Sequence, residues 1–116
     1  MTRLGEMHLQ DDGEFAAGHV RRRAASRGPL ALSAELAARG VDRGLVDEAL
    51  ARLTPEVQLA SAIDLVGRLA ARSRPAGYQE LLDRVGTKLL RRGFAPHLVR
   101  TACQAVWRGT DEPAEA

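Results

Sequence analysis

The sequence is poor in aromatic residues and contains no stretch with the pattern of a strand. Aromatic side chains make up 3% of the 116 residues, so a core has to be built from leucine, valine, alanine and isoleucine. No segment alternates Val, Ile, Thr or Tyr with polar residues, as half-buried strands do. Alanine is abundant and has the highest intrinsic helix propensity. The composition therefore predicts an all-α protein.

The sequence also lacks the residue groups that carry most catalytic and metal chemistry. The single cysteine, Cys103, excludes an internal disulfide framework and a cysteine-based zinc site. The histidines His8, His19 and His97 have no metal-ligand spacing with one another or with Cys103. There is no glycine-rich phosphate loop and no Ser/His/Asp set. We expect no enzyme, no metal and no cofactor.

Long apolar runs are absent as well. No stretch approaches the ~20 apolar residues that a helix needs to cross a bilayer, and the start of the sequence has no signal-peptide pattern. We therefore expect a cytoplasmic protein that makes no membrane contact.

Positive charge is concentrated in the second half of the chain. The formal net charge is only +2, but residues 1–67 carry a net −2, residues 68–108 a net +7 and residues 109–116 a net −3. Sixteen of the 17 basic residues are arginine, whose planar guanidinium binds carboxylates and phosphates through paired hydrogen bonds. The second half thus favours an acidic partner.

One short pattern occurs twice. Residues 36–46 read LAARGVDRGLV and residues 89–99 read LLRRGFAPHLV. An offset of 53 residues aligns Gly40 with Gly93. It also aligns three leucine, valine and alanine positions on the C-terminal side: Leu45 with Leu98, Val46 with Val99, and Ala49 with Ala102. The repetition predicts a duplicated unit.

Each copy has the pattern of a helix that stops at glycine and is followed at once by another helix. Glycine adopts the left-handed conformation of a C-terminal cap without a Cβ clash. We therefore predict that Gly40 and Gly93 are structural caps. Asp42 is a good N-cap for the next helix in the first copy. The second copy has Ala95, a poor N-cap, before Pro96, which suits the first helical position.

The apolar periodicity predicts six helices, at residues 9–26, 29–40, 42–53, 54–73, 78–93 and 96–108. We divide the chain into a frayed start (1–9), a first three-helix repeat (10–53), a second three-helix repeat (54–108) and a disordered acidic tail (109–116). Units of about 50 residues bury little apolar surface alone. Stacked units are therefore expected to share a core.

Two groups of basic residues are candidates for binding acidic side chains of a partner protein or DNA phosphate. The first group is Arg21, Arg22, Arg23 and Arg27, and the second is Arg68, Arg72, Arg84, Lys88, Arg91 and Arg92. A purely structural interpretation competes with binding, because cations near a helix C-terminus are favourable by about 0.3–1 kcal/mol. The local excess of positive charge favours a binding surface.

Several of these segments, taken in order, resemble the RecX family of RecA regulators. They are DDGEFAAGHVRRR (11–23), GPLALSAELAARGV (28–41), LVDEAL (45–50) and LLRRGF (89–94) followed by LV (98–99). No single segment is specific, but the ordered set covers roughly residues 9–107. The resemblance implies an elongated, curved array of tandem three-helix repeats.

The resemblance also implies a function. A RecX-like protein would bind the RecA–DNA filament along its groove, with DNA phosphate as a secondary contact. It would lower ATP hydrolysis, strand exchange and cleavage of the SOS repressor. A usual family member carries three repeats, whereas here the DDGEFAA segment begins near residue 11. The sequence is therefore either a shortened homologue or truncated at its start. We expect a monomer.

Two other functions remain open. The corners at Gly40 and Gly93 resemble a DNA-binding helix–turn–helix, in which the third helix of each unit would read the major groove. The first of these helices carries Asp47 and Glu48, which repel phosphate, whereas the second carries Arg100 and could contact DNA. A helical adaptor that binds no nucleic acid is the other alternative.

Overall fold

The computed structural model describes residues 2–111, and the side chains of residues 12–109. Its helices are α1 (Thr2–Arg23), α2 (Pro29–Ala38), α3 (Arg43–Leu50), α4 (Pro55–Ser73), α5 (Tyr78–Leu81), the π-helical turn η1 (Leu82–Gly86), α6 (Thr87–Arg91) and α7 (Pro96–Asp111). The segments α5, η1 and α6 follow one another without a break and form one helix. The predicted all-α fold is confirmed, and residues 2–111 contain no strand.

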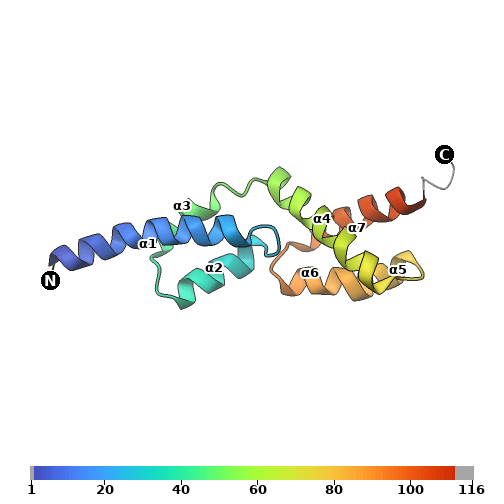
Figure 1. The fold of residues 1–116 in the computed structure, drawn as a ribbon, viewed down its shortest axis with the longest axis horizontal. Helices are drawn as coiled ribbons and strands as arrows, with labels where there is room; N and C mark the ends of the chain where they lie inside the picture. The colour runs from blue at the N-terminus through green and yellow to red at the C-terminus, as the bar shows by residue number, and fades with distance from the viewer. Residues whose placement is uncertain (1, 112–116) are drawn as a thin grey trace.

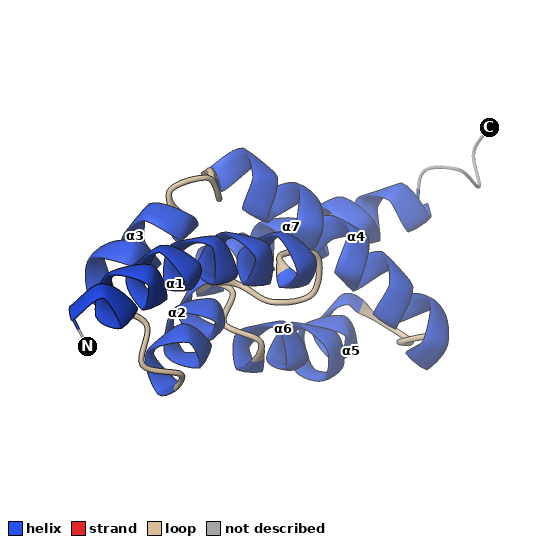
Figure 2. Ribbon diagram, turned by 60° about the vertical axis from the view of Figure 1, so that its left-hand side comes forward, coloured by secondary structure: helices blue, strands red, loops and turns tan. Residues whose placement is uncertain are grey.

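The helices form two three-helix units that lie one after the other along the long axis (Figure 1). In the first unit α1 packs against α3, with α2 beside them, and in the second α4 packs against α7, with α5–η1–α6 beside them. Figure 2 shows the helices of both units and the short loops between them from another side. The molecule measures 66 × 24 × 21 Å.

Each unit has its own core, which corrects the expectation of a shared one. Buried apolar side chains of the first unit form one cluster around Leu32 and Leu36. Those of the second unit form a separate cluster that includes Phe94 and Cys103. A shared core would require helices from different units to pack side chain against side chain. The units instead meet through backbone, as described below.

The described part of the chain differs from the predicted boundaries at both ends. Helix α1 begins at Thr2, inside the stretch predicted to be frayed. The sequence has no proline before Pro29, and a glycine in a helix costs only about 1 kcal/mol, so nothing in this stretch forces a break. Helix α7 continues to Asp111. The rest of the predicted acidic tail lies outside the described residues.

A π-helical turn interrupts the long second helix of the second unit, where the sequence predicted a regular α-helix. Three core residues there, Leu81, Val85 and Leu89, are spaced by four and are at most 1% exposed. In an α-helix of 3.6 residues per turn, positions spaced by four drift steadily around the helix. The wider turn at η1 reduces this drift. All three side chains lie in the core of the second unit.

The two glycine corners have the same hydrogen bonds. Gly40 has φ +84° and Gly93 has φ +93°, so both lie in the left-handed region. In the first corner the Val41 N–H donates to the Leu36 carbonyl at 3.1 Å. In the second the Phe94 N–H donates to the Leu89 carbonyl at 3.2 Å. These bonds define the Schellman motif, which ends a helix at a left-handed residue.

The second corner also holds the two units together. The N–H of Gly28, at the start of α2, donates to the carbonyl of Arg92 at 2.7 Å. A Cβ atom on Gly28 would lie 2.3 Å from the carbonyl oxygen of Gly93, and one on Gly93 would lie 2.3 Å from the Ala31 nitrogen. Only glycine at both positions allows this backbone approach. The Gly28 turn thus docks on the Gly93 corner.

Candidate functional site

The first candidate group, at the end of α1, is largely unpaired. Arg21, Arg22 and Arg23 are exposed, and none forms an ion pair with a described carboxylate. The last turn of a helix carries partial negative charge on its free carbonyl groups, which these cations offset. Part of their role is therefore local, but their guanidinium groups remain accessible to a partner.

Arg27, the fourth member of that group, is engaged inside the first unit. Its Nη1 lies 3.3 Å from Oε2 of Glu35, whose other oxygen lies 2.7 Å from Nε2 of the buried His19. The His19 ring in turn lies 5.7 Å from that of Phe15. Sequence reasoning missed this network, because nothing in the spacing of these residues brings them together. The ion pair with Glu35 therefore gives Arg27 a structural role within the first unit.

Three arginines of the second group also have partners within the chain. Arg68 pairs with Asp64 and Arg84 with Glu80, each at 3.1 Å and four residues apart on one helix. Arg92 is half-buried, and its Nη1 donates to the carbonyl of Ser26 at 3.4 Å across the junction between the units. Arg92 therefore belongs to the junction more than to a binding surface.

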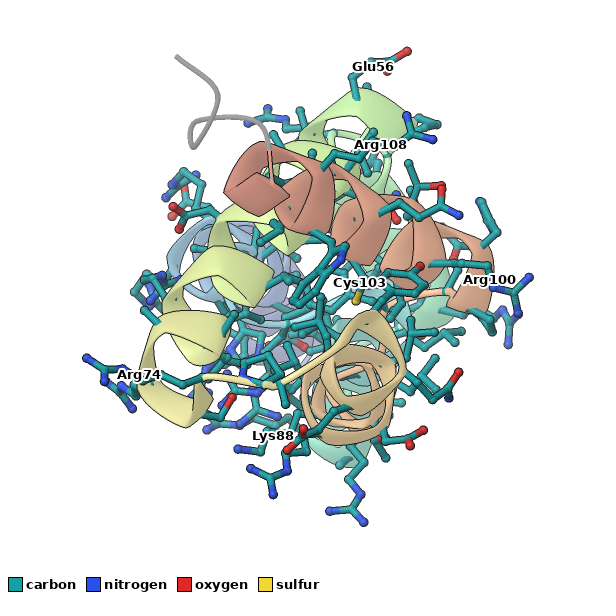
Figure 3. The ribbon with its side chains drawn as sticks, turned by 90° about the vertical axis from the view of Figure 1, so that its right-hand side faces the viewer. Glu56, Arg74, Lys88, Arg100, Cys103 and Arg108 are labelled. Atoms are coloured by element: carbon teal, nitrogen blue, oxygen red, sulfur yellow. The ribbon has the colours of Figure 1, made fainter. Side chains whose placement is uncertain are left out.

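Six cations of the second unit are exposed and have no described carboxylate partner: Arg72, Arg74, Lys88, Arg91, Arg100 and Arg108. Three of them, Arg72, Lys88 and Arg91, were candidates from the sequence. In Figure 3, Arg74, Lys88, Arg100 and Arg108 point away from the core on different sides of the second unit. The positive charge therefore surrounds the end of this unit and is not confined to one stripe.

The third helices of the two units differ in charge, which bears on the helix–turn–helix alternative. Helix α3 exposes Asp47 and Glu48. Helix α7 exposes Arg100, Gln104 and Arg108, which recur every four residues and so share one side of the helix. Only α7 could approach phosphate without repulsion. A pair of equivalent reading helices is therefore not present.

Metal binding and thiol reactivity both depend on how the described side chains are grouped and buried. No three His, Cys, Asp or Glu side chains within residues 12–109 are grouped so that they could hold a metal ion. Cys103 is fully buried, and burial raises the pKa of its thiol. A thiol that stays protonated and inaccessible is a poor nucleophile. In the part of the chain that the structure describes, no helix meets the length and apolarity required to cross a membrane.

Comparisons with known proteins agree with the fold and the ordered segments. Residues 11–50, the first unit, match a family model described as the second three-helix domain of RecX. The regulatory protein RecX of Geobacillus kaustophilus is 38% identical over 107 residues, which are 90% of this chain. That of Thermobifida fusca is 37% identical over 120 residues, which cover 98% of it. The chain belongs to the RecX family.

A solved RecX structure has the same fold. The crystal structure of RecX from Lactobacillus salivarius superposes with a TM-score of 0.76 at 24% identity, covering 90% of this chain and 70% of that one. This chain spans only part of its relatives: 39% of the Geobacillus protein and 65% of the Thermobifida protein. Its two units therefore correspond to a portion of those RecX proteins.

Proposed function

We propose that this chain is a non-enzymatic regulator that binds the RecA–DNA filament and inhibits RecA, lowering its ATPase activity, strand exchange and SOS repressor cleavage. The observation that carries this proposal is the RecX match along 90% or more of the chain. The 66 Å long axis suits a protein that lies along a polymer and contacts more than one of its subunits.

The second unit supplies the surface for this contact. Residues 68–108 carry a net +7, and six of their cations have no described carboxylate partner. Acidic side chains of the filament would be the main contacts. DNA phosphate would be a secondary one, since arginine binds either group. Among the described residues, Arg91 and Lys88 are exposed and have no carboxylate partner.

Charge reversal tests this surface. Replacing Lys88 and Arg91 together by glutamate should weaken binding to RecA filaments on single-stranded DNA by tenfold or more. Each substitution should lower stability by roughly 0.3–1 kcal/mol, because both residues lie in the last turn of α6, where positive charge is favourable. Co-sedimentation with the filaments measures binding, and circular dichroism verifies folding.

The matched control reverses two exposed, unpaired arginines of the first unit, Arg43 and Arg52. This control changes the net charge by the same amount and should retain most of the affinity. Equal losses in both double variants would show that only total charge matters. Unchanged affinity in the Lys88/Arg91 variant would reject this surface. Binding to DNA alone, compared over a range of salt, measures the phosphate contribution.

The helix–turn–helix alternative has weaker support. It needs a reading helix in each unit, and α3 exposes acidic side chains where α7 exposes basic ones. A chain that bound duplex DNA more tightly than RecA filaments would favour this alternative. An adaptor that binds neither would show no co-sedimentation in either assay.

A further inference from the structure

At the junction between the two units, a turn of the first unit docks on a corner of the second. The chain contains one further turn and one further corner of the same kinds. The turn is the segment before the second helix of a unit, with glycine as N-cap. The corner is the glycine cap between the second and third helices. In the junction, the Gly28 turn of the first unit docks on the Gly93 corner of the second.

The corner of the first unit is free. Gly40 has the same left-handed backbone as Gly93 and closes the same type of Schellman motif. A Cβ atom on Gly40 would meet nothing within 4 Å, whereas one on Gly93 would collide with the backbone of Ala31. Gly40 is exposed and Gly93 is buried. The difference arises because a turn covers only the second corner.

The turn of the second unit is free as well. Gly77 is the N-cap of α5 with extended backbone (φ −151°, ψ 172°), as Gly28 is the N-cap of α2 (φ −87°, ψ 173°). A Cβ atom on Gly77 would meet nothing within 4 Å. The extended conformation needs no glycine, so nothing within this chain's own described structure requires glycine at position 77.

The two free halves lie toward opposite ends of the molecule. In Figure 1 the α2–α3 corner lies in the left half of the picture and the α4–α5 turn at its right-hand end. Contact between them within one chain is therefore excluded, but contact between two chains arranged head to tail is not. The first helix of each unit should not obstruct this contact. Helices α1 (22 residues) and α4 (19 residues) are of similar length, and α4 leaves the Gly93 corner open to the Gly28 turn.

We propose that the free Gly40 corner binds the Arg74–Gly77 turn of a second copy of this chain, repeating the Gly28–Gly93 contact between molecules. The hydrogen bonds follow from that template. The Gly77 N–H would donate to the Arg39 carbonyl of the other copy, as the Gly28 N–H does to the Arg92 carbonyl. The guanidinium of Arg39 would reach the carbonyl of Pro75, as Arg92 reaches Ser26.

Charge and the present position of Arg39 support this occupant. The turn carries Arg72 and Arg74 in the second unit (residues 54–108), which has a net charge of +5, whereas the first unit (residues 10–53) has a net charge of 0. Two second units would therefore repel each other, whereas a neutral first unit adds no such repulsion, which favours head-to-tail approach over contact between two second units. Arg39 is exposed and lies 5.1 Å above the Phe15 ring, while its counterpart Arg92 is held in the junction. Arg39 is thus available for the same contact.

The contact would be weak and open-ended. One turn on one corner is small beside the roughly 1,000 Å² of a stable protein interface, so the chain would be monomeric when dilute. A heterologous contact that does not close on itself adds further copies. Association should therefore continue past the dimer as the concentration rises.

The test is a substitution that the single chain tolerates. Gly77→Ser places a good N-cap residue where the Cβ has free space, so stability should not fall. In the docked geometry that Cβ would meet the backbone of the Gly40 corner, since the corresponding atom on Gly28 would lie 2.3 Å from the Gly93 carbonyl oxygen. Association should weaken at least tenfold.

Sedimentation equilibrium of the chain at rising concentration and low salt measures this association. We expect the average mass of the unmodified chain to rise above 12.5 kDa and past that of a dimer. Gly77→Ser should stay near the monomer mass, and the control Gly109→Ser, also at an open position, should behave like the unmodified chain. A chain that stays monomeric at every concentration overturns the proposal, as does a Gly77→Ser variant that associates equally well. The assay contains neither RecA nor DNA, so its outcome is independent of the proposed function.

Discussion

The corners at Gly40 and Gly93 have the same backbone and different surroundings. Both end a helix with a left-handed glycine and the same pair of hydrogen bonds. Gly40 is exposed, while Gly93 is buried beneath the Gly28 turn of the other unit. Local sequence determines the conformation of each corner. Contact with a neighbouring unit determines whether a corner also holds two units together.

Alanine substitution at the two corner glycines separates these roles and should give the largest difference. Both variants place a Cβ in the left-handed region, which costs about 1–2 kcal/mol. Gly93→Ala adds a collision with Ala31, and overpacking of this kind costs about 1–3 kcal/mol. Urea unfolding should therefore show a loss of about 3 kcal/mol for Gly93→Ala and about 1 kcal/mol for Gly40→Ala. Equal losses would mean that the junction relaxes at no cost.

Alanine substitution at Gly28 and Gly77 tests the contact between the units without placing a Cβ atom in the left-handed region. Neither Gly28 nor Gly77 has positive φ, and both are N-caps, so the loss of capping is the same. Gly28→Ala collides with the Gly93 backbone and should cost about 1–3 kcal/mol more than Gly77→Ala. Thermal unfolding followed by circular dichroism compares them. A Gly28→Ala variant as stable as Gly77→Ala would contradict the docked junction.

Substitutions at the N-caps of α3 and α7, the helices that follow the two corners, should change stability by a smaller amount. Asp42 caps α3, with its Oδ2 accepting from the Gly44 N–H at 3.0 Å, whereas the residue before α7 is Ala95. Asp42→Ala should destabilise the chain by about 1 kcal/mol, and Ala95→Asp should stabilise it by about as much, within the range of N-cap exchanges. The same unfolding measurement checks both. A loss of stability in Ala95→Asp would show that the second corner cannot accommodate a capping side chain.

Features set by neighbouring residues were predictable, and features set by distant ones were not. The Gly40 and Gly93 corners follow from local capping rules, and the six helices from apolar periodicity. The junction joins Gly28 to Gly93 across 65 positions, and no local pattern marks it. The π-helical turn at η1 was missed because apolar residues spaced by four also fit one face of a regular α-helix.

The candidate surface shows the same division. Exposure of the basic residues follows from their charge, but their partners decide which are available. The pairs Asp64–Arg68 and Glu80–Arg84 are four residues apart, and that spacing is visible in the sequence. The pairing of Arg27 with Glu35 and the contact of Arg92 with Ser26 depend on the fold. Two candidates therefore changed role only when the structure was known.

Regulation of RecA by these two units can be measured through the ATPase rate of the cognate RecA on single-stranded DNA while this chain is titrated in. Circular dichroism should first show a folded, helical chain. We expect inhibition at well below one copy per RecA, and relief of that inhibition when Lys88 and Arg91 are replaced by glutamate. An unchanged ATPase rate at molar excess of the folded chain would contradict the claim that these two units regulate RecA.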